Sequence, residues 1–278
     1  MKKIKLVAVD MDGTLLNSEK HCSKRTIEAL KKAQDQGVII LPATGRAING
    51  LPQELKDLGV RYGIFCNGAT CYDRQEEKVL VANHFSVDEV ITLLQLCEKY
   101  DATHDIYAGG KGYCEKRYLD HIEEYVTEKP IQKLVKNTRE AIDGSLTDFI
   151  IQNNISVEKI NMFFKDLEER EVARKELAQT GMAEPVSSLT NNLETGRAGC
   201  SKGVALEQLI PVLGLTREEV MACGDANNDL TMLKAAGFAV AMKNATEQVK
   251  ESADYITDTN DEDGVAKAIE KFVLKGEA

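Results

Sequence analysis

Short apolar runs alternate with amphipathic segments at both ends of the chain. Residues 4–9 form a nearly continuous apolar run, which is typical of a strand covered on both faces. Residues 23–36 then follow a helical pattern, with Ser23 as a candidate N-cap and Gly37 directly after the end. Residues 38–41 form a second apolar run. This order predicts a β-α-β unit, from which parallel sheets are built.

The same alternation returns further along the chain. Strands are predicted at residues 64–66 and 220–223, and helices from Lys202 to about Leu209, ahead of Pro211, and from about Asn228. A further helix after Thr44 should start late, near Leu51, or kink there, because Pro52 interrupts it. The pattern predicts an α/β fold with a doubly wound parallel sheet, whose ligands bind beyond the carboxyl ends of the strands.

The middle of the chain follows a different pattern. Ser86 and Glu89 have the spacing of a capping box at the start of a helix, and residues 109–112 are rich in glycine, as in a hairpin. A strand at residues 159–164 and a helix at 166–179 follow. The simplest account is an inserted α/β domain at 84–190 within a core of 1–83 and 191–278.

Composition and charge narrow the range of partners. The formal net charge of the 278 residues is −10, and no basic stripe compensates for it, which argues against nucleic acid. No run approaches the roughly 20 apolar residues of a membrane helix, so no membrane association is expected. The seven scattered cysteines lack zinc-site spacing and favour a reduced cytoplasm. Oligomeric state is not determined by these features.

The first polar motif, Asp10-Met11-Asp12-Gly13-Thr14, directly follows the first predicted strand. An isolated Asp-Gly pair is usually only a turn. Here the motif occupies the place where a doubly wound sheet presents ligands, and three further polar segments occupy comparable places. The segment therefore becomes a candidate for chemistry.

Those three segments are Thr44-Gly45-Arg46, Lys202 at the start of a predicted helix, and the turn at residues 224–229. A hydroxyl and the N–H groups of a glycine turn can hold phosphate oxygens. A lone lysine is usually a solvated surface charge, and a turn with two carboxylates can be only an N-cap. Each signal is weak by itself, and their joint occurrence is the argument.

Convergence of Asp10, Asp12 and Asp225 would be costly without a cation. Two like charges about 4 Å apart repel by roughly 4 kcal/mol at an effective dielectric constant near 20. Oxygen ligands without cysteine or histidine select a hard ion, and a site that also receives a substrate phosphate suits Mg²⁺. We therefore expect Mg²⁺ as the cofactor.

These four motifs, in this order, resemble those of the haloacid dehalogenase superfamily. Residues 66–69 (Cys-Asn-Gly-Ala) and the long insertion are similar to the Cof-type phosphatases, which carry a large α/β cap domain on a Rossmann-like core. The resemblance spans nearly the whole chain.

The resemblance implies roles for the acidic residues. Asp10 would be the nucleophile that forms an aspartyl-phosphate, and Asp12 would act first as general acid and then as general base. Mg²⁺ would be held by the carboxylates of Asp10 and Asp225 and the backbone carbonyl of Asp12, with Asp229 as an outer partner.

The remaining motif residues would bind the phosphoryl group. The resemblance implies that Thr44 and Lys202 hold and neutralise it and that Asn228 contacts the substrate phosphate, while the turn at Gly45 offers N–H groups. Together these implications describe a magnesium-dependent phosphatase that hydrolyses a small phosphorylated metabolite. Sugar phosphates and phosphorylated cofactors, such as flavin or pyridoxal phosphates, are both compatible substrates.

Three other functions share parts of this pattern. A phosphotransferase or mutase would pass the phosphoryl group to a second hydroxyl instead of water. A signalling receiver domain also places Asp, Thr and Lys around Mg²⁺, but its small size does not accommodate the insertion or the turn at 224–229. A non-catalytic protein that binds phosphorylated metabolites would not need both Asp10 and Asp12.

Overall fold

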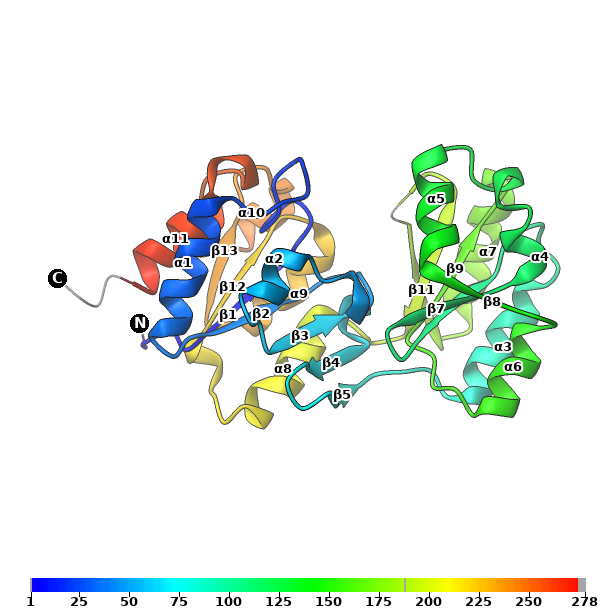
Figure 1. The fold of residues 1–278 in the computed structure, drawn as a ribbon, viewed down its shortest axis with the longest axis horizontal. Coiled ribbons are helices and arrows are strands. Elements are labelled where there is room, and N and C mark those ends of the chain that lie inside the picture. Colours follow the sequence, from blue (N-terminus) through cyan, green and yellow to red (C-terminus); the bar gives the residue numbers. More distant parts are fainter. Residues whose placement is uncertain (1, 188, 275–278) are drawn as a thin grey trace. The chain divides into compact units, whose positions relative to one another are not determined.

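The computed structural model describes residues 2–187 and 189–274, which divide into two units (Figure 1). The core unit contains the chain up to Arg46, Gly50–Ala82 and the chain from Ser201 onward, and the cap unit contains Ala47–Asn49 and Asn83–Cys200. Of the predicted core, residues 1 and 275–278 lie outside the described residues.

The second predicted domain boundary, between residues 190 and 191, is wrong. Strand β11 (Asn192–Arg197) pairs antiparallel with β9 (Lys159–Phe163) and with β10 (Ala183–Val186), so it belongs to the sheet of the cap unit. The return to the core therefore comes after Cys200.

The core sheet is parallel throughout, and its strand order is β14-β13-β12-β1-β2. Its four longer strands have buried apolar residues on both faces, as expected for a sheet covered by helices on both sides. The strands are β1 (Leu6–Val9), β2 (Ile39–Pro42), β12 (Val220–Gly224), β13 (Phe238–Ala241) and β14 (Tyr255–Ile256). The predicted fold class is confirmed.

Helices cover the two faces of this sheet. Helix α1 (Lys24–Asp35) connects β1 to β2, and α9 (Leu230–Ala235) connects β12 to β13 in the opposite direction along the sheet. Right-handed crossovers therefore put α1 and α9 on opposite faces. Helix α1 packs with α11 (Gly264–Phe272), and α9 packs with α8 (Lys202–Val212), as Figure 1 shows. The strand order reverses between β1 and β12, where such sheets bind ligands.

Proline affects the core helices in two ways. Pro52 stands directly before α2 (Gln53–Asp57), which accords with the predicted late start. The predicted end of α8 near Leu209 is wrong, because the helix includes Pro211 and continues to Val212. Pro211 lies so near the helix end that its missing N–H removes one bond, while the N–H of Leu213 still donates to the Leu209 carbonyl.

A small antiparallel sheet adjoins the core sheet. It contains β3 (Tyr62–Phe65), β4 (Thr70–Asp73) and β5 (Lys78–Ala82). The turn η2 (Cys66–Gly68) joins β3 to β4. A parallel bridge from Ala43 to Ile64 connects the end of β2 with this sheet.

The cap unit has a six-stranded sheet of its own, in the order β10-β11-β9-β6-β7-β8. The three strands not yet introduced are β6 (Asp105–Ala108), β7 (Lys111–Glu115) and β8 (Arg139–Ile142). Gly109 and Gly110 join β6 to β7, and both have positive φ. The predicted hairpin is confirmed.

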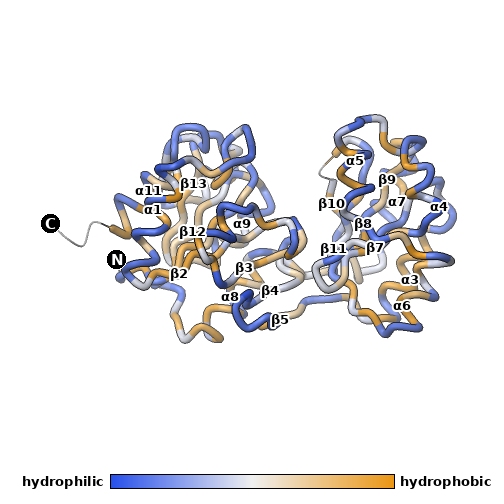
Figure 2. Tube along the Cα trace, in the orientation of Figure 1, coloured by the Kyte–Doolittle hydropathy of each residue, from blue (hydrophilic) through white to orange (hydrophobic). Residues whose placement is uncertain are grey.

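Helices α3 (Val87–Cys97), α6 (Leu146–Asn153) and α7 (Leu167–Gln179) share one hydrophobic core with the cap sheet. The capping box of Ser86 and Glu89 opens α3 as predicted. In Figure 2 these helices carry both hydrophobic and hydrophilic stretches, as expected for helices with one buried face. Within residues 2–187 and 189–274, no helix has the length and apolar character to cross a membrane.

Candidate active site

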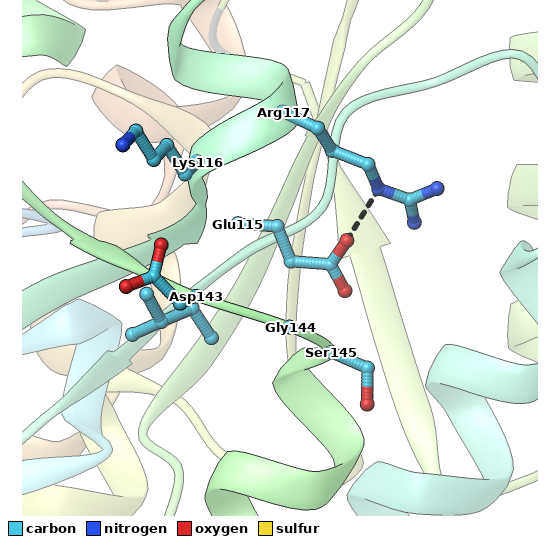
Figure 3. A pocket seen from close by; sticks show the side chains of 7 residues that line it. Glu115, Lys116, Arg117, Asp143, Gly144 and Ser145 are labelled. Carbon is cyan, nitrogen blue, oxygen red and sulfur yellow. Dashed lines mark hydrogen bonds and ion pairs between the residues drawn. The ribbon is translucent and has the colours of Figure 1, made fainter.

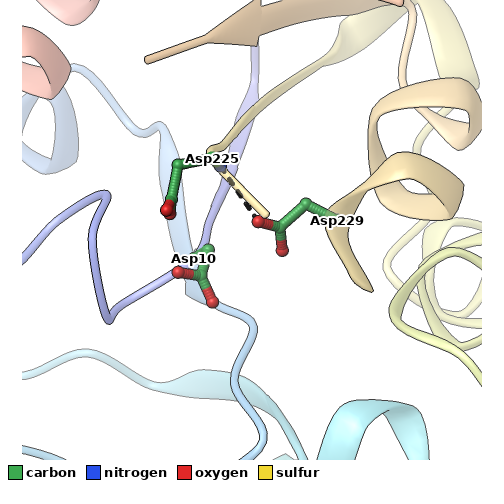
Figure 4. Close-up of side chains that lie close together, drawn as sticks. All are labelled: Asp10, Asp225 and Asp229. Carbon is green, nitrogen blue, oxygen red and sulfur yellow. Dashed lines mark hydrogen bonds between the residues drawn. The ribbon is translucent and has the colours of Figure 1, made fainter. Parts of the chain in front are cut away.

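Three aspartates converge where β1 and β12 end (Figure 4). Asp10 follows β1 and Asp225 follows β12, and the two strands are neighbours in register. Asp229 lies one turn further on, at the start of α9. One carboxylate oxygen from each of the three aspartates lies within 4.8 Å of the other two. The structure thus brings together Asp10, Asp225 and Asp229 of the predicted site.

Lys202 lies inside this acidic cluster. Its ammonium group donates to Oδ1 of Asp10 at 2.5 Å and to Oδ1 of Asp229 at 2.6 Å, and the residue is only 1% exposed. Burial lowers the pKa of Lys202, but the charges of Asp10 and Asp229 more than offset this and raise it overall. The lysine is therefore a buried, fixed cation.

Negative charge still exceeds positive charge in the cluster. Burial raises the pKa of Asp10 to about 7, with Asp229 and Asp225 adding to the rise and Lys202 opposing it. Burial also raises the pKa of Asp225. Three carboxylates next to one ammonium leave two negative charges in excess when all are ionised. A donor set made only of oxygens, with this charge, fits a hard divalent cation.

Glycine permits the close approach of the two loops. Gly13 has φ of +92°, and a Cβ there would lie 2.5 Å from Oδ2 of Asp225. The next residue, Thr14, donates from its hydroxyl to Oδ1 of Asp225 at 2.6 Å. Any larger residue at position 13 would push Asp225 away from the cluster.

Asp229 has more contacts than the outer role predicted for it requires. Its Oδ1 accepts from Lys202, and its Oδ2 accepts from the N–H groups of Asp225 and Ala226, each at 3.0 Å. The residue is fully buried. Asp229 therefore fixes both the turn that carries Asp225 and the position of Lys202.

Asp12 points toward two cations. Arg46 donates from Nε to Oδ2 at 2.9 Å and from Nη2 to Oδ1 at 2.8 Å, and Lys20 donates to Oδ1 at 3.0 Å. Burial raises the pKa of Asp12, but the hydrogen bonds and charges of Arg46 and Lys20 outweigh it and hold this pKa below its usual range.

The predicted phosphate-binding residues lie on the loops beside the cluster. Thr44 directly follows β2, is buried, and accepts from the N–H of Arg46 through its hydroxyl at 3.1 Å. Asn228 precedes Asp229 and donates from its amide to Oδ1 of Asn67 at 3.1 Å. A Cβ at Gly45 would lie 3.2 Å from the amide of Asn67, so these loops are in close contact.

Sequence reasoning missed three residues of this region. Thr14 belongs to the first motif, so its position beside Asp10 and Asp12 was a usable signal. Asn67 lies in the segment 66–69 on which the resemblance rests, but no role was assigned to it. Asn67 and its neighbour Cys66 have positive φ, a conformation that non-glycine residues seldom adopt. Lys20 offered no signal in the sequence.

The cap unit contains a hollow of its own, of about 370 Å³ (Figure 3). Glu115 is its main buried charge, and its carboxylate accepts from Nε of Arg117 at 2.6 Å and from the N–H of Leu146 at 2.9 Å. This carboxylate is therefore satisfied by the protein itself. The hollow is lined by Glu115, Lys116, Arg117, Ile142, Asp143, Gly144 and Ser145, none of which belongs to the acidic cluster.

Comparison with known proteins gives consistent results. The sequence model of the haloacid dehalogenase-like hydrolase family matches residues 7–269 of this chain. The 5-amino-6-(5-phospho-D-ribitylamino)uracil phosphatase YcsE of Bacillus subtilis is 33% identical, with 98% of this chain and 96% of YcsE covered. Phosphatase YwpJ of the same organism is 32% identical, with 95% and 98% covered. A haloacid dehalogenase-like hydrolase from Bacteroides thetaiotaomicron superposes with a TM-score of 0.83 at 32% identity, with 97% and 99% covered.

Proposed function

The chain belongs to the haloacid dehalogenase-like hydrolases, and on this premise we propose that it is a magnesium-dependent phosphatase that works through an aspartyl-phosphate on Asp10. Family membership confirms the resemblance seen in the four sequence motifs. The observation that carries the proposal is the excess of negative charge where Asp10, Asp225 and Asp229 surround Lys202.

In the first half of the reaction, a carboxylate oxygen of Asp10 attacks phosphorus. The bond from phosphorus to the leaving oxygen breaks, and Asp12 gives its proton to that oxygen, so an alcohol departs. Because Arg46 and Lys20 lower the pKa of Asp12, the protonated form that starts this step is the minor form of the free protein. Lys202 lies 2.5 Å from Oδ1 of Asp10 and provides a fixed positive charge beside the attacked phosphoryl group. Positioning and charge stabilisation of this kind are the main requirements of phosphoryl transfer.

In the second half, water replaces Asp10 on phosphorus. Asp12, now a carboxylate, takes a proton from the attacking water, and the bond between phosphorus and Asp10 breaks. Inorganic phosphate leaves, while Asp10 returns to a carboxylate and Asp12 regains its proton. Lys202 and Asp229 keep their places throughout, because both are buried and bonded to each other at 2.6 Å.

The residues present fit a magnesium ion. The carboxylates of Asp10 and Asp225 and the backbone carbonyl of Asp12 would hold it, with Asp229 behind them. When bound, the ion would supply positive charge to the phosphoryl oxygens and offset the repulsion between the carboxylates.

The substrate proposed is a small phosphorylated metabolite. The name of the relative YcsE describes the removal of phosphate from a phosphorylated ribitylamino compound. Sugar phosphates and phosphorylated cofactors share this phosphomonoester group, which Thr44, Gly45, Lys202 and Asn228 would bind here.

The decisive experiment is a phosphate-release assay over a panel of phosphorylated metabolites. We expect turnover with Mg²⁺, loss of turnover with EDTA, and recovery when Mg²⁺ is added back. Asp10→Asn should reduce kcat by roughly 1,000-fold or more, because the amide is a poor nucleophile. The control Asp258→Asn changes a core carboxylate paired with Lys267 on the surface, and it should leave kcat unchanged.

Two outcomes would contradict the proposal. Undiminished turnover by Asp10→Asn would exclude an aspartyl-phosphate on this residue. Formation of an isomeric phosphate ester without release of inorganic phosphate would instead assign the chain to the phosphotransferases or mutases.

A further inference from the structure

Asp12 is held by two cations from different loops. Arg46 follows β2, Lys20 lies in the loop between β1 and α1, and three hydrogen bonds join them to both oxygens of Asp12. We propose that Lys20 and Arg46 are positioning residues that fix the Asp12 carboxyl group for proton transfer. This inference rests on the function proposed above.

The contact of Arg46 is anchored at both ends. Its Nε and Nη2 make a two-pronged contact with Asp12, while its Nη1 donates to the carbonyl of Gly50 at 3.2 Å. A planar guanidinium fixed in this way allows one orientation of the carboxylate plane. Arg46 therefore sets the rotation of the Asp12 side chain.

Lys20 is presented by a loop that holds an unfavourable backbone conformation. Its φ of +66° lies in the left-handed region, which costs a non-glycine residue roughly 1–2 kcal/mol. The N–H of Lys20 donates to the carbonyl of Asn17 at 2.9 Å, and the N–H of His21 donates to Oδ1 of Asn17 at 2.9 Å. The loop is thus closed by its own hydrogen bonds and places the lysine side chain at Asp12.

Asp12 and Lys20 both have solvent-exposed side chains. The Asp12 side chain is 39% exposed and that of Lys20 is 61% exposed, in contrast to the buried Asp10 and Lys202. We call Lys20 and Arg46 together the clamp. The clamp orients the Asp12 carboxyl group at the exposed edge of the acidic cluster.

The clamp should matter most when the leaving oxygen needs a proton. As the phosphorus–oxygen bond breaks, the proton of Asp12 passes to the leaving oxygen, and this transfer requires the carboxyl group in the orientation that Arg46 and Lys20 hold. An alkoxide is strongly basic and cannot leave without that proton. The 4-nitrophenolate ion is weakly basic and can leave without it.

The test compares two esters, glycerol phosphate and 4-nitrophenyl phosphate, through kcat/KM, which reports the steps up to the first phosphoryl transfer. Lys20→Met should lower kcat/KM for glycerol phosphate on the order of 10-fold or more, while the value for 4-nitrophenyl phosphate changes less than about threefold. Lys20→Arg keeps the charge and should restore most of the loss. Lys20 is exposed, so its variants should fold.

Lys5→Met is the matched control, because Lys5 is a similarly exposed lysine paired with Glu219 at 2.7 Å on the core surface. It should leave both esters unaffected. An equal loss of kcat/KM on both esters would assign Lys20 to phosphate binding, and no loss on either would remove it from the reaction. Both results overturn the clamp. Wild-type protein that is inactive on both esters with Mg²⁺ would instead overturn the proposed function, and the clamp with it.

Discussion

The core and the cap each bury a cluster of charged side chains, but the charges balance only in the cap. There, Asp105 faces Arg139 at 3.3 Å and Lys159 contacts Glu194 at 2.6 Å. Asn161, directly opposite Asp105 in the register of β6 and β9, donates to Oδ2 of Asp105 at 2.9 Å. Two carboxylates and two cationic side chains therefore lie on one face of the cap sheet.

In the core, Asp10, Asp225 and Asp229 surround the single cation Lys202. Burying a charge costs free energy unless a partner compensates for it. The cap cluster holds as many cations as carboxylates, although burial still raises the pKa of Asp105. The core cluster has about two negative charges in excess, which a divalent cation would offset.

Breaking the balance in the cap should have the largest effect on stability. Arg139→Met leaves the buried Asp105 without its cation, and this should reduce the free energy of unfolding by about 3–5 kcal/mol in denaturant titrations. The double variant with Asp105→Asn should recover part of the loss. Arg25→Met, which breaks the exposed pair with Glu270, is the control and should have little effect. A similarly small effect of Arg139→Met would show that the cap pair is not structural.

His104 is a further buried titratable residue of the cap, and in the folded protein it is uncharged near neutral pH because its pKa is lowered. Burial lowers the pKa of His104 to about 4, and Nε2 has no hydrogen-bond partner among the residues described. The unfolded chain takes up this proton below about pH 6.5, whereas the folded protein takes it up only near pH 4, so stability falls as the pH drops through this window.

His104→Leu removes this titration. As the pH falls from 6.5 to 4, the wild type should lose up to about 3 kcal/mol more unfolding free energy than the variant. Above pH 7 the difference between the two should be constant. The measurement is denaturant unfolding at a series of pH values, and parallel curves for the two proteins would contradict the assignment.

The sequence predicted the parts of the fold that depend on local pattern. Alternating apolar runs gave the doubly wound sheet, and Ser86 with Glu89 gave the start of α3. The second domain boundary was missed because β11 joins the cap sheet by pairing with β9, some 30 residues earlier in the chain. No local pattern encodes such a pairing.

The site was predictable for a similar reason, and only in part. Asp10 and Asp225 directly follow apolar strands, so the rule for parallel sheets places them at one edge. Lys20 depends on a left-handed turn and on its reach to Asp12, and the balanced pair of Asp105 and Arg139 depends on the register of several strands. In a sequence these residues resemble ordinary surface charges.

Neutralising a carboxylate of the acidic cluster should have the smallest effect on the free energy of unfolding. It gives the clearest contrast with the cap, because it should stabilise the protein instead of destabilising it. Without Mg²⁺, Asp225→Asn removes one of the repelling carboxylates. It should raise the free energy of unfolding by about 1 kcal/mol, a modest value because Asp225 is partly exposed. The corresponding change in the cap, Asp105→Asn, leaves the buried guanidinium of Arg139 without its carboxylate and should not stabilise the protein.

Magnesium should then reverse the order of wild type and variant. At 100 times its dissociation constant, a ligand of the folded state stabilises it by about 2.7 kcal/mol, and Asp225→Asn should forfeit most of that gain. Denaturant unfolding of both proteins with Mg²⁺ and with EDTA measures the two effects together. Equal responses to Mg²⁺, or a loss of stability by the variant in EDTA, would mean that the excess charge at Asp225 does not serve to bind the ion.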